Sequence, residues 1–135
     1  MNKLLICTHG KFGEELVRSV EMIAGKLNNT IAISLLPTMS IDDYIEKIRD
    51  NLEEENNYLC LTDLFGGTPC NSLVSLSREY NLDIICGVNM PMVLESTSIL
   101  SSKSMDEIKE QLLHVYDNSG FDVLKKIKEG INNGN

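Results

Sequence analysis

A histidine and an aspartate in the first half of the chain are the residues best suited to chemistry. His9 follows an apolar run at residues 3–7, and Asp63 follows a second apolar run around Leu61. Runs of this kind are typical of strands buried on both faces of a parallel sheet. An aspartate bonded to one imidazole nitrogen fixes the tautomer and leaves the other nitrogen as a nucleophile. The two residues therefore predict a histidine nucleophile oriented by a carboxylate, provided that their strands adjoin at about 5 Å.

A glycine turn comes directly after this aspartate. Gly66 and Gly67 allow the backbone to turn sharply and to expose its N–H groups. Thr68 and Pro69 are expected to be the N-cap and the first residue of the next helix. The backbone donors of Gly66, Gly67 and Thr68, with the threonine hydroxyl, suit a phosphoryl group. Because the chain contains no Walker lysine motif, a nucleotide-binding P-loop is not expected.

Simpler interpretations of these residues stay open at this point. Asp63 also fits an ordinary cap in a strand–helix turn, and a lone histidine such as His9 is more often a core or capping residue. His114 is the second histidine, and a structural or solvent-exposed role is expected for it. A metal centre of Cys7, His9, Asp63 and Cys70 lacks local ligand spacing, so no metal and no cofactor are predicted.

Strands and helices alternate along the chain. Strands are expected at residues 3–7, 31–36, around 61 and 82–87, and helices are expected to begin near residues 12, 40, 68, 91 and 104. This order predicts a doubly wound α/β fold, with a mainly parallel sheet of four strands and helices on both faces. Right-handed crossovers bring the carboxyl ends of all strands to one edge. His9, Asp63 and the loop at residues 87–91 should meet there.

Local signals support several helix starts. Ser40 with Asp43 and Ser104 with Glu107 have the spacing of capping boxes. Pro91 suits the first turn of a helix. The methionines on either side of Pro91, at positions 90 and 92, fit either core packing or a rim that faces a partner.

The C-terminal segment is ambiguous. Residues 121–128 fit either a helix or an edge strand, and the residues from Gly130 onward are expected to be frayed. No repeat, linker or low-complexity segment is present. The chain is therefore expected to form a single domain at residues 1–130, followed by a flexible tail at 131–135.

Composition narrows the class of protein. The chain has 135 residues, of which 42% are hydrophobic, and a net charge of −8. This charge argues against nucleic acid and anionic membranes as partners and favours a partner with a basic face. No stretch is predicted to span a membrane, and the apolar run near the start is too short to be expected as a signal peptide. The four cysteines, without CxxC spacing, fit buried thiols in a reducing cytosol. A cytoplasmic protein is expected.

Three phrases resemble one known family. THG at residues 8–10, TDLFGGTPCN at 62–71 and GVNMPMVLE at 87–95 are similar to the IIA domain of the mannose-family sugar phosphotransferase system. The resemblance covers essentially the whole chain. Members of this family often have Thr-Trp where this chain has Leu64-Phe65, and an aromatic residue is common where Cys70 stands.

The resemblance implies a role for each of these residues. His9 would accept a phosphoryl group from phospho-HPr and pass it to a IIB component, with Asp63 as the orienting carboxylate. Gly66, Gly67 and Thr68 would lie beside the phosphoryl group.

The resemblance also implies the partners. It suggests a homodimer. Some members exchange a C-terminal strand between subunits, and the segment at residues 121–128 would be the candidate for such an antiparallel edge strand here. Because no hinge linker or second domain follows in this sequence, the IIB component is expected to be a separate polypeptide. Contact with the membrane would be indirect, through the IIC/IID permease. The alternatives are a phosphorylation-dependent regulatory binding module and the phosphocarrier subunit of a dihydroxyacetone kinase.

Overall fold

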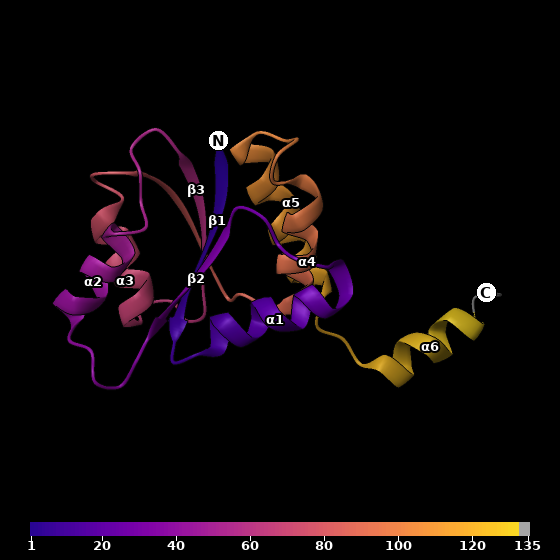
Figure 1. Ribbon diagram of the computed structural model, residues 1–135. Coiled ribbons are helices and arrows are strands. Elements are labelled where there is room, and N and C mark those ends of the chain that lie inside the picture. The colour runs from indigo at the N-terminus through magenta and orange to yellow at the C-terminus, as the bar shows by residue number, and fades with distance from the viewer. Residues whose placement is uncertain (133–135) are drawn as a thin grey trace.

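A four-stranded parallel sheet forms the centre of the molecule, as the alternating pattern predicts (Figure 1). The structure, a computed structural model, describes residues 1–132. The strands are β1 (Asn2–His9), β2 (Thr30–Leu35), β3 (Asn57–Thr62) and β4 (Asn81–Cys86), in the spatial order β2-β1-β3-β4. All three strand pairs are parallel, so the expected mainly parallel sheet is entirely parallel.

Five helices cover the two faces of the sheet. They are α1 (Phe12–Ala24), α2 (Ile41–Arg49), α3 (Thr68–Leu76), α4 (Met90–Ile99) and α5 (Met105–Asn118). Helices α1, α4 and α5 pack on one face, and α2 and α3 pack on the other (Figure 1). The fold is therefore doubly wound.

Strand β1 shows why the sheet is buried on both faces. Its side chains alternate, so Leu4 and Ile6 contribute to the core beneath α1, α4 and α5, whereas Leu5 and Cys7 face α2 and α3. All four are at most 1% exposed. An apolar run without polar alternation is the pattern that such a central strand requires.

The predicted helix starts are confirmed at α2 and α5. The Ser40 hydroxyl accepts a hydrogen bond from the Asp43 N–H at 3.0 Å, and the Asp43 carboxylate accepts one from the Ser40 N–H. Ser104 and Glu107 form the same reciprocal pair at α5. At α4 the cap is Asn89, with Pro91 in the first turn.

The C-terminal segment is a helix, α6 (Val123–Asn132), and the edge strand suggested by the resemblance is wrong for the described chain. α6 projects away from the sheet and its covering helices (Figure 1). Of the expected flexible tail at 131–135, Ile131 and Asn132 belong to α6, and residues 133–135 lie outside the described residues. None of the helices within residues 1–132 combines the length and the apolar character needed to cross a membrane.

Candidate functional site: a histidine–aspartate pair at the carboxyl edge of the sheet

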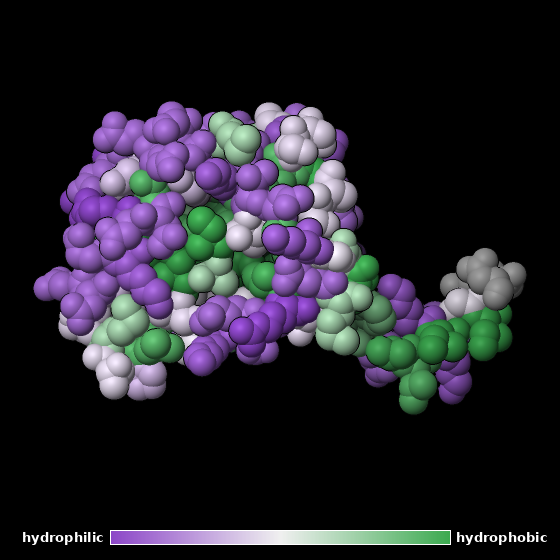
Figure 2. Space-filling view, in the orientation of Figure 1, coloured by the Kyte–Doolittle hydropathy of each residue, from purple (hydrophilic) through white to green (hydrophobic). Residues whose placement is uncertain are grey.

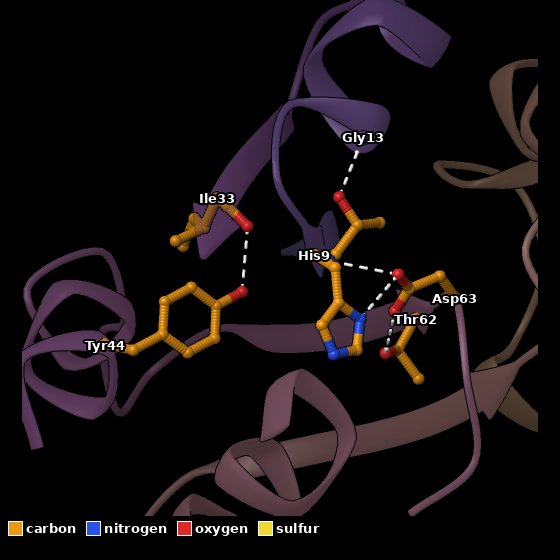
Figure 3. A network of polar contacts seen from close by, with 7 residues as sticks. His9, Gly13, Ile33, Tyr44, Thr62 and Asp63 are labelled. Carbon is orange, nitrogen blue, oxygen red and sulfur yellow. Dashed lines mark hydrogen bonds and ion pairs between the residues drawn. The ribbon is translucent and has the colours of Figure 1, made fainter. Parts of the chain in front are cut away.

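His9 and Asp63 lie side by side because β1 and β3 are neighbours. The register pairs Cys7 with Thr62, so both strands end at the same edge. One oxygen of Asp63, Oδ2, lies 3.0 Å from the backbone nitrogen of His9 and 2.9 Å from its Nδ1 (Figure 3). The side chain of His9 is 47% exposed and that of Asp63 is 15% exposed. The predicted pair is thus assembled, with the imidazole open to solvent.

This geometry fixes the tautomer of His9. Burial raises the pKa of Asp63, but the hydrogen bonds from the side chain and backbone of His9 outweigh it, and the pKa is lowered overall. Asp63 is therefore ionised at neutral pH, and an ionised carboxylate only accepts hydrogen bonds. Nδ1 must then donate its proton to Oδ2, which leaves the lone pair on Nε2.

The glycine turn packs directly against this imidazole. A Cβ atom on Gly67 would lie 2.8 Å from Cε1 and 3.4 Å from Nε2 of His9, so a side chain there would push the imidazole out of its position. Gly66 has a φ of +80°, which glycine adopts without strain. The turn is closed by the Gly67 N–H, which donates to the Leu64 carbonyl at 3.2 Å. Gly67 therefore acts mainly through its lack of a side chain.

The start of α3 differs by one residue from the prediction. The N-cap is Gly67, Thr68 is the first helical residue, and Pro69 is the second. Within residues 1–132, the N–H groups of Thr68 and Cys70 have no hydrogen-bond acceptor. These two amides are the donors that the helix start leaves open beside His9.

Two threonines complete the site and were not singled out from the sequence. Thr8 is fully buried, and its Oγ1 accepts a hydrogen bond of 2.7 Å from the Gly13 N–H, which closes the turn that carries His9. The Thr62 hydroxyl lies 3.4 Å from Oδ1 of Asp63 (Figure 3). The available signal was that a threonine precedes both His9 and Asp63.

The loop after β4 also reaches this edge, as predicted. The Val88 N–H donates to the Thr62 carbonyl at 3.0 Å. Asn89 accepts a bond from the Met92 N–H at 3.0 Å and thereby holds the loop against the start of α4. Met92 is fully buried and Met90 packs on the same core, so the partner-facing methionine rim is wrong and core packing is right.

The other candidate residues from the sequence, the proposed metal ligands and His114, do not form a second site. Among residues 1–132, no three His, Cys, Asp or Glu side chains come together as metal ligands. Burial raises the pKa of Cys7 to about 12, partly offset by a hydrogen bond with Tyr44, so this thiol is protonated. His114 lies on the outer face of α5, in a hollow that it shares with Glu107, Glu110 and Asp117.

Comparison with known proteins gives one consistent family. Residues 3–113 match the family described as "PTS system fructose IIA component". The fructose-specific EIIA component of Bacillus subtilis is 34% identical over 83% of this chain and 80% of its own length. The mannose-specific EIIAB component of Escherichia coli is 29% identical over 93% of this chain, which spans only 39% of that relative.

Solved structures agree with the sequence comparison. The EIIA component from Streptococcus agalactiae has a TM-score of 0.86 and 27% identity, covering 93% of this chain and 99% of its own. The mannose/sorbose-specific IIA subunit from Enterococcus faecalis has a TM-score of 0.82 and 28% identity, covering 90% and 93%. The chain belongs to the EIIA components of the mannose family of the sugar phosphotransferase system.

Proposed function

We propose that this protein is a phosphocarrier that accepts a phosphoryl group on Nε2 of His9 from phospho-HPr and passes it to a IIB component. The observation that carries the proposal is the double hydrogen bond from His9 to a single oxygen of Asp63. That arrangement leaves the Nε2 lone pair as the one nucleophile of the ring and holds the ring still. Family membership supports a phosphotransfer role in general terms.

The transfer exchanges one N–P bond for another. The Nε2 lone pair of His9 attacks the phosphorus, the N–P bond to the donor histidine breaks, and the electron pair of that bond stays with the donor nitrogen. The His9 ring then carries both the phosphoryl group and the Nδ1 proton. Asp63 stabilises the positive charge that this leaves on the ring, as a carboxylate does beside an imidazolium. Transfer to IIB repeats the exchange with the acceptor as nucleophile.

The phosphoryl group needs local stabilisation because it adds roughly −1.5 to −2 charge to a protein of net charge −8. The open amides of Thr68 and Cys70, the Thr68 hydroxyl and the N-terminus of α3 supply donors beside Nε2. An N-terminal helix dipole contributes about 0.3–1 kcal/mol at an exposed site. Gly66 and Gly67 let the backbone approach the group closely. Stabilisation of this size suits a carrier that must release the group again.

The proposal includes a homodimer in the cytoplasm, with membrane contact only through the IIC/IID permease. α6 supports the dimer, since Leu124, Ile127 and Ile131 are all exposed and their spacing puts them on one side of the helix. A second copy of the chain would cover this stripe.

A relay assay tests the phosphocarrier proposal. Phospho-HPr, a IIB component and this protein are mixed, and phosphoryl on IIB is followed with time. Onward transfer in the presence of the protein, and none with His9→Ala, is expected. Phosphorylation of His9 without any transfer to a cognate IIB would instead support a regulatory binding module.

A further inference from the structure

A small hollow lies between α2 and α3, and we call it the α2–α3 hollow. Its volume is about 160 Å³. Two isoleucines of α2 and four polar residues of α3 line it: Ile41, Ile45, Thr68, Asn71, Ser72 and Ser75. Ile41, Asn71 and Ser75 are exposed, so the α2–α3 hollow opens to solvent.

One hydroxyl in the α2–α3 hollow is buried without a partner. Ser72 is 2% exposed, and its Oγ has no hydrogen-bond partner within residues 1–132. Burying a hydroxyl without a hydrogen bond is unfavourable, and buried polar groups in proteins are nearly always satisfied. An alanine at this helical position would avoid that penalty and has the higher helix propensity. The Ser72 hydroxyl is therefore suited to bind a group that enters the hollow from outside.

The other polar groups on the α3 side also have hydrogen-bonding capacity to spare. Asn71 donates through Nδ2 to the Gly66 carbonyl at 3.1 Å, which leaves its Oδ1 as an acceptor facing away from that bond. The Ser75 hydroxyl donates to the Ser72 carbonyl at 2.7 Å, so its oxygen can still accept. Thr68 adds a further hydroxyl. The α3 side of the hollow thus offers both donors and acceptors.

The lining residues define the chemistry of a ligand. None of the six is ionisable, so the α2–α3 hollow suits a neutral molecule. Ligand hydroxyls both donate and accept, which matches the α3 side, whereas Ile41 and Ile45 suit a carbon chain. A volume of about 160 Å³ equals that of about five waters at about 30 Å³ each, which is room for about three or four carbons with their hydroxyls.

We propose that the α2–α3 hollow is a binding site for a small neutral polyol, with the Ser72 hydroxyl as its central hydrogen-bonding group. The carbon chain of the polyol packs on Ile41 and Ile45, and its hydroxyls bond to the side chains of α3. The site shares Thr68 with the phosphoryl site, but its other residues take no part in the phosphoryl transfer proposed above.

A titration with erythritol tests the site, since this polyol has four carbons, four hydroxyls and no charge. The ¹⁵N-labelled protein is titrated, and its backbone amide resonances are followed by NMR. We expect saturable shifts confined to the first turns of α2 and to α3, with a Kd on the order of 1–10 mM for a ligand of about eight non-hydrogen atoms. Shifts that rise linearly over the whole titration and spread across the surface would show a cosolvent effect and overturn the proposal.

Ser72→Ala tests the central hydrogen bond. The Kd for erythritol should rise at least about five-fold, the effect of losing one hydrogen bond. Ser77→Ala is the matched control, because the Ser77 hydroxyl is exposed at the end of α3 and bonds to the Val74 carbonyl. Its Kd should equal that of the wild type. Equal Kd values for Ser72→Ala and the wild type would overturn the assignment of Ser72.

The melting temperature without erythritol gives an independent readout. Ser72→Ala should melt at a higher temperature than the wild type, because the substitution removes a buried hydroxyl that has no partner. A lower melting temperature would show that the hydroxyl is satisfied within the protein, and the proposal would fail.

A charged analogue tests the class of ligand. Erythronate has the carbon chain of erythritol with a carboxylate at one end, and it should bind more weakly because no cationic side chain lines the α2–α3 hollow. Tighter binding of erythronate would overturn the assignment of a neutral ligand. None of these measurements uses a phosphoryl donor, so their outcome is independent of the proposed function.

Discussion

At the scale of single residues, one carboxylate oxygen organises the site. Oδ2 of Asp63 accepts from both the backbone and the ring of His9, so it sets the direction of the side chain and the tautomer together. A hydrogen-bonded carboxylate is commonly used to present the second imidazole nitrogen for reaction. The two functions of Asp63 can be separated by substitution.

Asp63→Asn should slow phosphorylation of His9 by a factor on the order of 10²–10⁴, as loss of the correct tautomer does in serine-protease triads. The asparagine amide keeps the size of the side chain but offers an N–H₂ group that can pair with the wrong ring tautomer. Single-turnover phosphorylation gives the rate, and ¹⁵N NMR of the imidazole gives the tautomer. Asp83→Asn is the control, because Asp83 pairs with Lys109 and not with His9. It should leave the phosphorylation rate and the tautomer of His9 unchanged.

The same carboxylate makes stability depend on pH in the acid range. The pKa of Asp63 is lowered in the folded state from its ordinary value of 3.8. Its contribution is therefore fully present above that value and is lost as the pH falls through the lower folded-state pKa. The difference in free energy of unfolding between the wild type and Asp63→Asn should shrink below about pH 4. A difference that stays constant from about pH 6 down to acid unfolding would show that the charge of Asp63 contributes nothing to stability.

At the scale of elements, the turns at the ends of β1 and β3 decide whether the site forms. The turn after β1 depends on the bond between Thr8 and Gly13, and the turn after β3 depends on the contact between Gly67 and His9. Each contact joins two elements: Thr8 and His9 belong to β1, Gly13 belongs to α1, and Gly67 caps α3. Both turns are therefore positions where a small change should affect phosphorylation without changing the fold.

Gly67→Ala should reduce the rate of His9 phosphorylation at least about ten-fold, or about 1.4 kcal/mol in the barrier. The new Cβ would lie 2.8 Å from Cε1, so the ring must rotate away from Asp63. Gly120→Ala is the control, because a Cβ there meets nothing within 4 Å. The far-ultraviolet circular dichroism of both variants should match that of the wild type; an unchanged phosphorylation rate in Gly67→Ala would contradict the packing argument.

Thr8→Val should lower the free energy of unfolding by about 1–3 kcal/mol, because the Gly13 N–H loses its buried acceptor. Thr8→Ser keeps the hydroxyl and should recover most of that loss. Urea denaturation measures the free energy of unfolding of both variants. Equal destabilisation by valine and serine would assign the effect to packing of the threonine methyl group.

Much of this architecture could be predicted from the sequence because its signals are local. The capping pairs Ser40–Asp43 and Ser104–Glu107 fix helix starts within three residues, and unbroken apolar runs identify the buried strands. Contacts such as Gly67 against His9 depend on the neighbouring strands. The sequence placed the two residues on one edge but did not determine the distance between them.

The C-terminal segment is a region where local sequence patterns do not decide between a helix and a strand. Phe121, Val123 and Ile127 fit the period of a strand for part of their length and the period of a helix for the rest. What such a segment becomes depends on the surface that it packs against. In the described chain it forms α6, which packs on no other element over any large area (Figure 1).

At the scale of the whole molecule, the surface divides into a mostly polar body and a projecting helix, α6, that has one apolar side. Figure 2 shows polar side chains over most of the visible body and a continuous hydrophobic stretch along α6. Exposed apolar surfaces of this kind mark sites of association in many proteins, which supports the proposed homodimer. A homodimer that buries it should depend on the apolar side of α6 and not on its charged side.

Ile127→Asp should therefore convert a dimer to a monomer, because the charge would be buried in the interface without a partner. Ile127 is 56% exposed in the single chain, so the substitution should not unfold the body. Sedimentation velocity over a range of concentrations measures the change. Glu129→Ala, on the charged side of the same helix, should remain dimeric, and a monomer for the wild type would remove the dimer from the proposal.

The central claim is that His9 alone carries the phosphoryl group, and intact mass spectrometry tests it most directly. The wild type, His9→Ala and His114→Ala are each incubated with phosphoenolpyruvate, enzyme I and HPr at neutral pH. We expect one acid-labile phosphoryl group on the wild type and on His114→Ala, and none on His9→Ala. A phosphoryl group that persists on folded His9→Ala, or one that is lost in His114→Ala, would contradict it.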